Sequence, residues 1–399
     1  MRFGLRHDAR LPPRILVTDA QDRAALAAVR CLREARYLVS AAADARSAPA
    51  LWSRGWSTVT VLPNPAAGVD RFIDRLEEFL LENRHDVLLP LRDETLYAIS
   101  ARRHRIKPHV ALGLPSHDVV ERALDKVCLA TEAQNVGLAT PDGQVCEHLE
   151  QALSAARSFG FPVLVKGMRT VVEVDGRLVR YPSRLVLHEQ ALRDAHKQIG
   201  TCIVQRRERG NVLSLAGVAT DRGLLGSVTS RYHRTWPPTA GMASFLVTIT
   251  PPVGLSERVE ALVSAIGWRG VFQLQLIECD NGAIKAIDFN PRMYGSMSVA
   301  QAAGAPLAAL WCAWLLGEDP KPVTARTGVA YRWEEGDAQH IVWRIRRRDY
   351  RGAAVAALPR RGATHGYFRV RDPMPAVAAG VQFARQLWHE FQHRSRHQK

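Results

Sequence analysis

Two neighbouring segments near residue 280 carry polar side chains of the types that bind hard cations. Both segments, 271–277 and 283–289, are alternating apolar runs, and the turn between them contains Asn-Gly. Asn-Gly between such runs predicts a β-hairpin, because both residues tolerate the positive φ angle of a tight turn. Side chains two positions apart share one face of a strand. The polar side chains that we expect to converge at the strand ends are Gln273, Gln275, Asp288 and Asn290.

One carboxylate and several amide oxygens at one place are a plausible donor set for Mg²⁺. This ion is held by few carboxylates and carbonyl oxygens, while nucleotide phosphates complete its shell. The alternative is a solvated hairpin whose polar side chains bind nothing. The hairpin pattern alone leaves both interpretations open.

Two lysines lie where they could contact phosphate oxygens. Lys126 follows Asp125 within the segment 116–135, which predicts a helix, and Lys166 ends the apolar run 161–167, which predicts a strand. The lysine ammonium is a compact charge suited to phosphate. Most lysines lie on protein surfaces, so neither position predicts a phosphate site by itself.

The elements that must position these residues fall into two patterns. Up to about residue 116, apolar strand runs alternate with amphipathic helices such as 70–83, which predicts βαβ units around a parallel sheet. No G-x-G-x-x-G loop is present there, so a dinucleotide site is not predicted. Later segments read as hairpins, including 170–187 around Asp175-Gly176 and the pair 211–220 with 224–231.

Composition limits the class of protein. The chain has 399 residues, 47% of them hydrophobic, and a formal net charge of +15, which favours a polyanionic partner such as nucleic acid, anionic lipid or a phosphorylated ligand. No nucleic-acid reading module accompanies the charge, so we expect no specific nucleic-acid partner. The six scattered cysteines lack a C-x-x-C pair, which predicts neither a zinc site nor a disulfide framework.

The ends of the chain and one uncharged segment bear on location. The N-terminus has no apolar signal region. The segment 296–317 is uncharged, but its apolar density is too short for a bilayer, so we expect a buried helix. We therefore expect a cytoplasmic protein. A terminal helix over 376–394 carries an apolar stripe opposite basic residues; we favour packing on the protein, with contact to an anionic membrane surface as the alternative. The stripe residues are Val381, Ala384, Leu387, Trp388 and Phe391.

The order of these features resembles the ATP-grasp superfamily, in particular carboxylate–amine ligases and the large subunit of carbamoyl phosphate synthetase. The order is Asp-Lys at 125–126, Lys-Gly at 166–167, Val-Gln at 204–205 and Asp-x-Asn-Pro-Arg at 288–292. The resemblance covers about residues 14–317. It implies a mixed α/β and α+β fold: an N-terminal parallel α/β domain, then a two-subdomain ATP-grasp fold with ATP in the cleft between antiparallel sheets.

The implied domain boundaries follow from the same resemblance. The expected segments are the α/β domain at 14–116, the ATP-grasp domain at 117–317, its subdomains at 117–203 and 204–317, and a C-terminal extension at 318–399.

The resemblance also implies roles for individual residues. Arg292 would bind the substrate carboxylate or acyl phosphate, and Arg234 belongs to a segment that would cross the active site. The ligands implied for Mg²⁺ or Mn²⁺ are Gln275, Asp288 and Asn290. The residues implied to contact ATP, the lysines at its phosphates and the others near its adenine, are Lys126, Lys166, Val204, Gln205 and Glu208.

The implied function is an ATP- and Mg²⁺-dependent ligase that joins a small carboxylate to an amine through an acyl phosphate, forming a C–N bond. One departure concerns the loop after Lys166, which lacks the glycines that let backbone N–H groups approach phosphates. Arg169 is then expected to supply a side-chain contact. This departure leaves open an ATP-binding protein with little catalysis and a regulatory or scaffold role.

Overall fold

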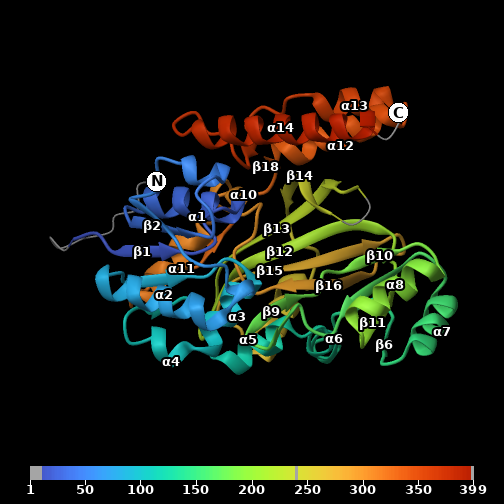
Figure 1. Cartoon of the computed structure of the whole chain (residues 1–399), viewed down its shortest axis with the longest axis horizontal. Helices are drawn as coiled ribbons and strands as arrows, with labels where there is room; N and C mark the ends of the chain where they lie inside the picture. Colours follow the sequence, from blue (N-terminus) through green and yellow to red (C-terminus); the bar gives the residue numbers. More distant parts are fainter. Residues whose placement is uncertain (1–10, 239–240, 397–399) are drawn as a thin grey trace.

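The structure is a computed structural model that describes residues 11–238 and 241–396 of the chain. Within that part, a parallel N-terminal sheet, two mainly antiparallel sheets and a layer of C-terminal helices pack together (Figure 1). The predicted mixed fold class, a parallel α/β region followed by antiparallel sheets, is confirmed.

The N-terminal region is a parallel sheet with the strand order β3-β2-β1-β4-β5. Alternate residues of β1 enter two different cores, Ile15 on one face and Leu16 on the other, so both faces of the sheet are covered. The order reverses between β1 and β4, and a crevice forms at the carboxyl ends of strands at such a point. The elements are β1 Arg14–Val17, α1 Arg23–Glu34, β2 Leu38–Ala43, η1 Pro49–Trp52, β3 Thr58–Val61, η2 Pro65–Ala67, α2 Val69–Glu82, β4 Val87–Leu89, α3 Asp93–Ala101, α4 Arg103–Ile106 and β5 Ala111–Leu112.

The second sheet is antiparallel, in the order β10-β7-β11-β6, and has its own core beneath α7 and α8. The predicted single helix over 116–135 is wrong: it breaks at Asp125, whose carboxylate accepts the backbone N–H groups of Val127 and Cys128 and so caps a second helix. The elements are α5 His117–Leu124, α6 Lys126–Asn135, β6 Gly143–Cys146, α7 Leu149–Phe159, β7 Val163–Gly167, β8 Val171–Val174, β9 Arg177–Arg180, β10 Arg184–Val186, α8 Glu189–Ile199 and β11 Cys202–Arg206.

The third sheet has the order β16-β15-β12-β13-β14-β18-β19, and β17 pairs with β13. The hairpin predicted around residue 280 is confirmed as β15 and β16, with Gln275 opposite Asp288 and Gln273 opposite Asn290. The uncharged segment 296–317 forms two short helices, α10 and α11, and α11 is largely buried. The elements are β12 Gly210–Thr220, β13 Gly223–Trp236, β14 Met242–Ile249, α9 Leu255–Ile266, β15 Gly270–Cys279, β16 Ile284–Asn290, α10 Ser298–Ala302, α11 Leu307–Leu315, β17 Val323–Thr324, β18 Ala330–Arg332 and β19 Thr364–His365.

Three helices complete the chain: α12 Glu334–Arg346, α13 Tyr350–Ala357 and α14 Met374–Arg396, which we call the C-terminal layer. They lie together along one side of the molecule (Figure 1). The extension also adds β17, β18 and β19 to the third sheet, so it is continuous with the preceding region. Among the described residues, no helix is long and apolar enough to cross a membrane.

A buried ion pair attaches the C-terminal layer to the N-terminal region. Arg30 of α1 donates from Nε to Asp372 Oδ2 at 3.0 Å and from Nη2 to the carbonyl of Tyr367 at 2.7 Å. Ser53 Oγ and the backbone N–H of Arg54 donate to the same carboxylate. Residues 318 to 342 positions apart in the chain are therefore joined by one desolvated carboxylate just before α14.

We expect Arg30→Met to lower the free energy of unfolding by about 3 kcal/mol, because it leaves the buried Asp372 carboxylate without its cation. Urea unfolding measures this change, and limited proteolysis is expected to cut near Asp372 faster. Arg33→Met, at an exposed position of the same helix, is the control and is expected to match the parent protein. Equal stability of the two variants would contradict the anchoring role.

Candidate active site

A cleft of about 540 Å³ lies between the second and third sheets. Its walls come from α6, β6, β7 and β11 on one side and from β16 on the other. The predicted phosphate residues Lys126 and Lys166 both line it, beside Ala286 and Ile287. Two lysines that are 40 positions apart in the sequence thus meet at one edge of the third sheet.

The two lysines converge on the end of β16. Lys126 Nζ donates to Asp288 Oδ1 at 2.7 Å, and Lys166 Nζ donates to the carbonyl oxygen of Ile287 at 2.8 Å. The position of Lys126 follows from the helix break at Asp125, because it makes Lys126 the first residue of α6. The break that the sequence pattern missed therefore aims this lysine at the cleft.

Burial and charge set the protonation of the cluster. Burial, together with the nearby Lys126, lowers the pKa of Lys166 to about 8, although Asp288 acts in the opposite direction. Burial alone would raise the pKa of Asp288, but Lys126 and Lys166 outweigh it and hold that pKa below its usual range. The cluster therefore carries an ionised carboxylate with more cationic than anionic charge beside it.

The amide side chains of the proposed metal set lie on the same strand pair. Gln275 is directly opposite Asp288, and Asn290 Nδ2 donates to Gln273 Oε1 at 3.5 Å. Gln273 in turn donates to the buried Tyr232 hydroxyl at 3.2 Å. In the described part of the chain, no group of three or more His, Cys, Asp or Glu side chains could hold a metal alone. A cation here would depend on amide oxygens and on oxygens of a bound ligand.

Arg292 is held by a carboxylate from the N-terminal region. Its Nε donates to Asp93 Oδ1 at 2.6 Å, and its Nη2 donates to Asp93 Oδ2 at 3.2 Å and to Asn290 Oδ1 at 3.3 Å. Burial would raise the pKa of Asp93, but Arg292 and Arg180 outweigh it and lower that pKa. Asp93, at the start of α3, is 3% exposed in its side chain. Sequence reasoning missed it, because no local pattern marks a partner 199 positions away.

The glycine-poor segment after Lys166 forms a hairpin, β8 and β9, that docks on the N-terminal region. The carbonyl of Gly176 accepts the backbone N–H of Val69, and Arg102 pairs with Glu173 at 2.8 Å. From the same hairpin, Arg180 reaches Asp93 at 3.3 Å and Glu94 at 3.6 Å. Arg169 pairs with Glu121 and Asp125, so the cation that this hairpin adds beside Arg292 is Arg180.

The residues predicted to meet adenine lie in different surroundings. Val204 is fully buried in the middle of the second sheet, while its neighbours Ile203 and Gln205 line the cleft. Gln205 Oε1 is buried and has no hydrogen-bond partner in the described structure. Glu208 pairs with Lys285 at 2.7 Å and is not among the residues that line the cleft.

Arg234 is engaged by the C-terminal layer. It forms a bidentate pair with the buried Asp337 of α12, at 2.9 and 2.6 Å, and stacks on Phe245. It does not line the cleft. Part of the segment that follows it, at 239–240, lies outside the described residues. The structure therefore brings Lys126, Lys166, Asp288 and Arg292 together, and it leaves Arg234 with a separate partner.

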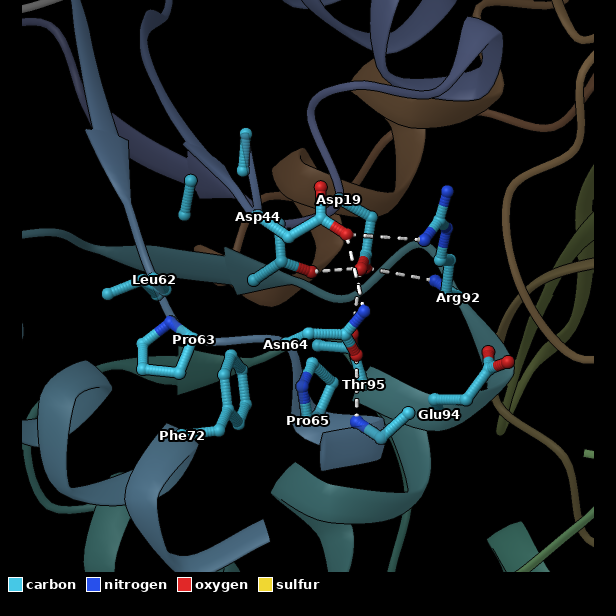
Figure 2. A pocket seen from close by; sticks show the side chains of 14 residues that line it. Asp19, Asp44, Leu62, Pro63, Asn64, Pro65, Phe72, Arg92, Glu94 and Thr95 are labelled. Atoms are coloured by element: carbon cyan, nitrogen blue, oxygen red, sulfur yellow. Dashed lines mark hydrogen bonds and ion pairs between the residues drawn. The ribbon is translucent and has the colours of Figure 1, made fainter. Parts of the chain in front are cut away.

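A second cavity, of about 70 Å³, opens at the reversal of strand order in the N-terminal sheet (Figure 2). Asp19 follows β1 with a φ of 53° and accepts from Thr95 Oγ1 and from the backbone N–H groups of Leu91 and Arg92. Burial raises the pKa of Asp19 to about 6. Asp44, Glu94 and the Arg92 side chain complete the polar wall. One oxygen of Glu94, Oε2, is buried without a partner in the described structure.

Known proteins resemble this chain in sequence at a distance. No family model matches it. The carbamoyl phosphate synthase large chain of Vibrio cholerae is 25% identical over 225 residues, and that of Vibrio parahaemolyticus is 24% identical over 225 residues. Each match covers 52% of this chain and 20% of the relative, so it spans one fifth of the relative's length.

Solved structures resemble it over most of its length. The biotin carboxylase domain of Hydrogenobacter thermophilus 2-oxoglutarate carboxylase, in complex with MgADP, ADP and bicarbonate, has a TM-score of 0.61 at 16% identity and covers 80% of this chain and 74% of its own. L-amino acid ligase from Bacillus licheniformis has a TM-score of 0.58 at 14% identity, and the match covers 79% of this chain and 76% of that protein. N5-carboxyaminoimidazole synthetase from Staphylococcus aureus, complexed with ADP, has a TM-score of 0.58 at 11% identity. The match covers 80% of this chain and 81% of that protein. At these identities the likeness shows the fold.

We expect Asp93→Asn to lower the free energy of unfolding by about 3–5 kcal/mol, because Arg292 would remain buried without a counter-charge. Urea unfolding of the full chain measures this change. The control is Asp319→Asn, which removes an exposed partner of Arg222 and is expected to leave stability nearly unchanged. If both variants unfold at the same urea concentration, the Asp93–Arg292 pair does not join the two regions energetically.

Proposed function

We propose, on the premise that this chain has the ATP-grasp fold, that it is an ATP- and Mg²⁺-dependent ligase that joins a small carboxylate to an amine. The observation that carries the proposal is the convergence of Lys126, Lys166, Asp288 and Arg292 around the end of β16. The two lysines line the cleft, Lys126 pairs with Asp288, and Arg292 donates to Asn290. These residues come from three separate segments of the chain, since Asp288 and Arg292 belong to the same one. Such a reaction is placed in the cytoplasm, where ATP is available.

The residues of the cleft fit a nucleotide. The excess cationic charge of Lys126 and Lys166 is buried, and phosphate oxygens would complete their hydrogen bonding. The unpartnered Gln205 Oε1 is a hydrogen-bond acceptor suited to the amino group of an adenine. Asp288, Gln275 and Asn290 would hold Mg²⁺ with few protein oxygens, which suits an ion that retains phosphate ligands.

The proposed reaction has two steps, phosphorylation of the carboxylate and attack of the amine on the acyl phosphate. An oxygen of the substrate carboxylate attacks the terminal phosphorus of ATP, the bond to ADP breaks, and an acyl phosphate forms. The amine then attacks the acyl carbon, phosphate leaves, and the new C–N bond loses one proton. ATP would supply the phosphoryl group, and a Mg²⁺ ion held beside it would neutralise the negative charge on that group. The protein contributes position and electrostatics: the lysines would hold the phosphates, and Arg292 would orient the carboxylate.

The N-terminal cavity is proposed to receive the amine. Its polar wall includes Asp44 and Glu94, and carboxylates there favour a cationic or hydrogen-bond-donating group. The unpartnered Glu94 Oε2 lies one residue along α3 from Asp93, which holds Arg292. Thus α3 would carry the acceptor side and the acyl side of the reaction on consecutive residues. The small volume suits part of a ligand, such as its amino end.

We expect Asp288→Ala to lower turnover of ATP by at least about 100-fold without unfolding the chain, because the charge that organises the phosphate end of the cleft is lost. Release of ADP or AMP and of product across a panel of acids and amines measures turnover. Asp280→Ala, in the exposed turn of the same hairpin, is the control.

The outcome of the same panel separates the alternatives. Binding of ATP-Mg²⁺ by calorimetry without any ADP or AMP would favour the regulatory alternative left open by the glycine-poor segment. A parent protein that neither binds nor turns over ATP would overturn the proposal.

We expect binding of ATP to take up protons above pH 8. Lys166 has a pKa of about 8 in the free protein, so it is largely neutral at pH 8.5, whereas bound phosphates favour its charged form. Calorimetry at pH 8.5 in buffers of different ionisation enthalpy measures the uptake, which is expected to vanish near pH 6.5. Affinity should fall as the pH rises through about 8. Lys166→Arg is expected to abolish the uptake and Lys197→Arg to retain it; uptake in both variants would assign it elsewhere.

A further inference from the structure

The C-terminal layer presents one of its faces to the protein and another to solvent. On α14, Pro375 and Ala379 are buried against the N-terminal region, where η1 packs. Val377, Val381 and Trp388 are 53%, 48% and 63% exposed, and Ala384 is exposed as well. Residues spaced four, three and four positions apart lie on one stripe of a helix, opposite the buried pair. The helix therefore has an apolar stripe that faces away from the body.

Other exposed apolar side chains lie on the helices of the same layer or in the segments just before and after them. Of the twenty large apolar side chains that are exposed in the described residues, nine fall between 345 and 388. Single exposed apolar residues are ordinary, but a cluster of them marks an interaction surface. Besides those of α14, they are Ile345, Tyr350, Val355, Leu358, Phe368 and Val370.

The net positive charge of the chain is concentrated in the C-terminal stretch of sequence that contains most of this layer. Residues 344–399 contain twelve arginines and one lysine against three acidic residues, which accounts for ten of the fifteen net positive charges of the protein. Two of those acids are already engaged, Asp349 by Arg344 and Asp372 by Arg30. The exposed Arg346, Arg351 and Arg361 form no ion pair within the described part of the chain.

We propose that the outer face of the C-terminal layer docks on the surface of an anionic lipid bilayer. An amphipathic helix that lies in the plane of the interface buries an apolar stripe, places a tryptophan at the headgroup level and is held by basic residues against anionic lipid. The stripe of α14 and the surrounding arginines supply these three features. The helix lies on the membrane, and the catalytic cleft stays in the aqueous phase on the rest of the molecule.

Charge and apolarity together distinguish this occupant from others. A second copy of the chain would bring two strongly cationic layers face to face, at an electrostatic cost. A nucleic acid would satisfy the arginines but would leave Val377, Val381 and Trp388 without an apolar partner. A bilayer with anionic headgroups satisfies both sets of side chains.

The test is co-sedimentation of the full chain with two kinds of vesicle. One kind contains phosphatidylcholine alone, and the other contains phosphatidylcholine with about 30% phosphatidylserine, as in a strongly anionic membrane. The parent protein is expected to sediment with the anionic vesicles and not with the neutral ones. Two variants alter the surface. The apolar variant combines Val381→Asp with Trp388→Asp, and the arginine variant combines Arg346→Glu, Arg351→Glu and Arg361→Glu. We expect each variant to lower the partition coefficient into anionic vesicles at least about tenfold.

Matched controls separate the surface from general effects. The apolar control alters two exposed apolar residues elsewhere on the protein, Leu81→Asp and Val253→Asp. The charge control changes the net charge by the same amount as the arginine variant and combines Arg193→Glu, Lys197→Glu and Arg269→Glu. Both controls are expected to retain binding. Circular dichroism melting confirms that each variant is folded.

Three outcomes would overturn the proposal. The first is equal sedimentation with neutral and anionic vesicles, or none with either. The second is an equal loss of vesicle binding in both control variants and in the surface variants. The third is a parent protein that ignores vesicles but binds a 30-base-pair duplex, or forms a dimer by sedimentation velocity, through the residues of the outer face.

Discussion

A buried guanidinium requires a carboxylate, and most of the active-site architecture depends on how this chain meets that requirement. Arg292, at the end of the hairpin β15–β16, is neutralised by Asp93 at the start of α3. The pair ties the N-terminal region to the third sheet just beyond the end of β16. It also explains why Asp93 stays ionised although it is almost completely buried: Arg292 and Arg180 outweigh the desolvation that would raise its pKa.

The same constraint accounts for the hairpin β8–β9. A glycine-rich loop can offer backbone N–H groups to phosphate, but the residues after Lys166 are β-branched and charged, so they form strands instead. The hairpin packs on η2 and α3, and Arg180 adds a second cation to Asp93. Opening of the hairpin would therefore disturb both regions together.

The C-terminal extension combines a packed face and a solvent-exposed apolar face, which its sequence pattern presented as alternatives. One face of α14 packs on the protein, held by the Arg30–Asp372 pair, and the opposite face leaves apolar residues in solvent. The predicted packing of Val381 and Trp388 is wrong, since both are exposed, while the side chains of Leu387 and Phe391 lie outside what the structure describes. The buried face uses the smaller residues Pro375 and Ala379, which allow close approach to η1.

Local patterns in the sequence determined the elements that carry the site. The hairpin around Asn281-Gly282, the strand that ends in Lys166, the parallel N-terminal sheet and the order of motifs that resembles ATP-grasp enzymes all depend on residues close together in the chain, where periodicity and turn chemistry act. Tertiary structure alone decided which charges meet. The partners Asp93, Arg180 and Asp337 depend on contacts between residues far apart in the chain, 199 positions for Asp93 with Arg292 and 103 for Asp337 with Arg234. The break at Asp125 that aims Lys126 comes instead from a local cap, which the pattern of apolar residues does not show. Ion pairs follow from burial and geometry, which no local pattern encodes.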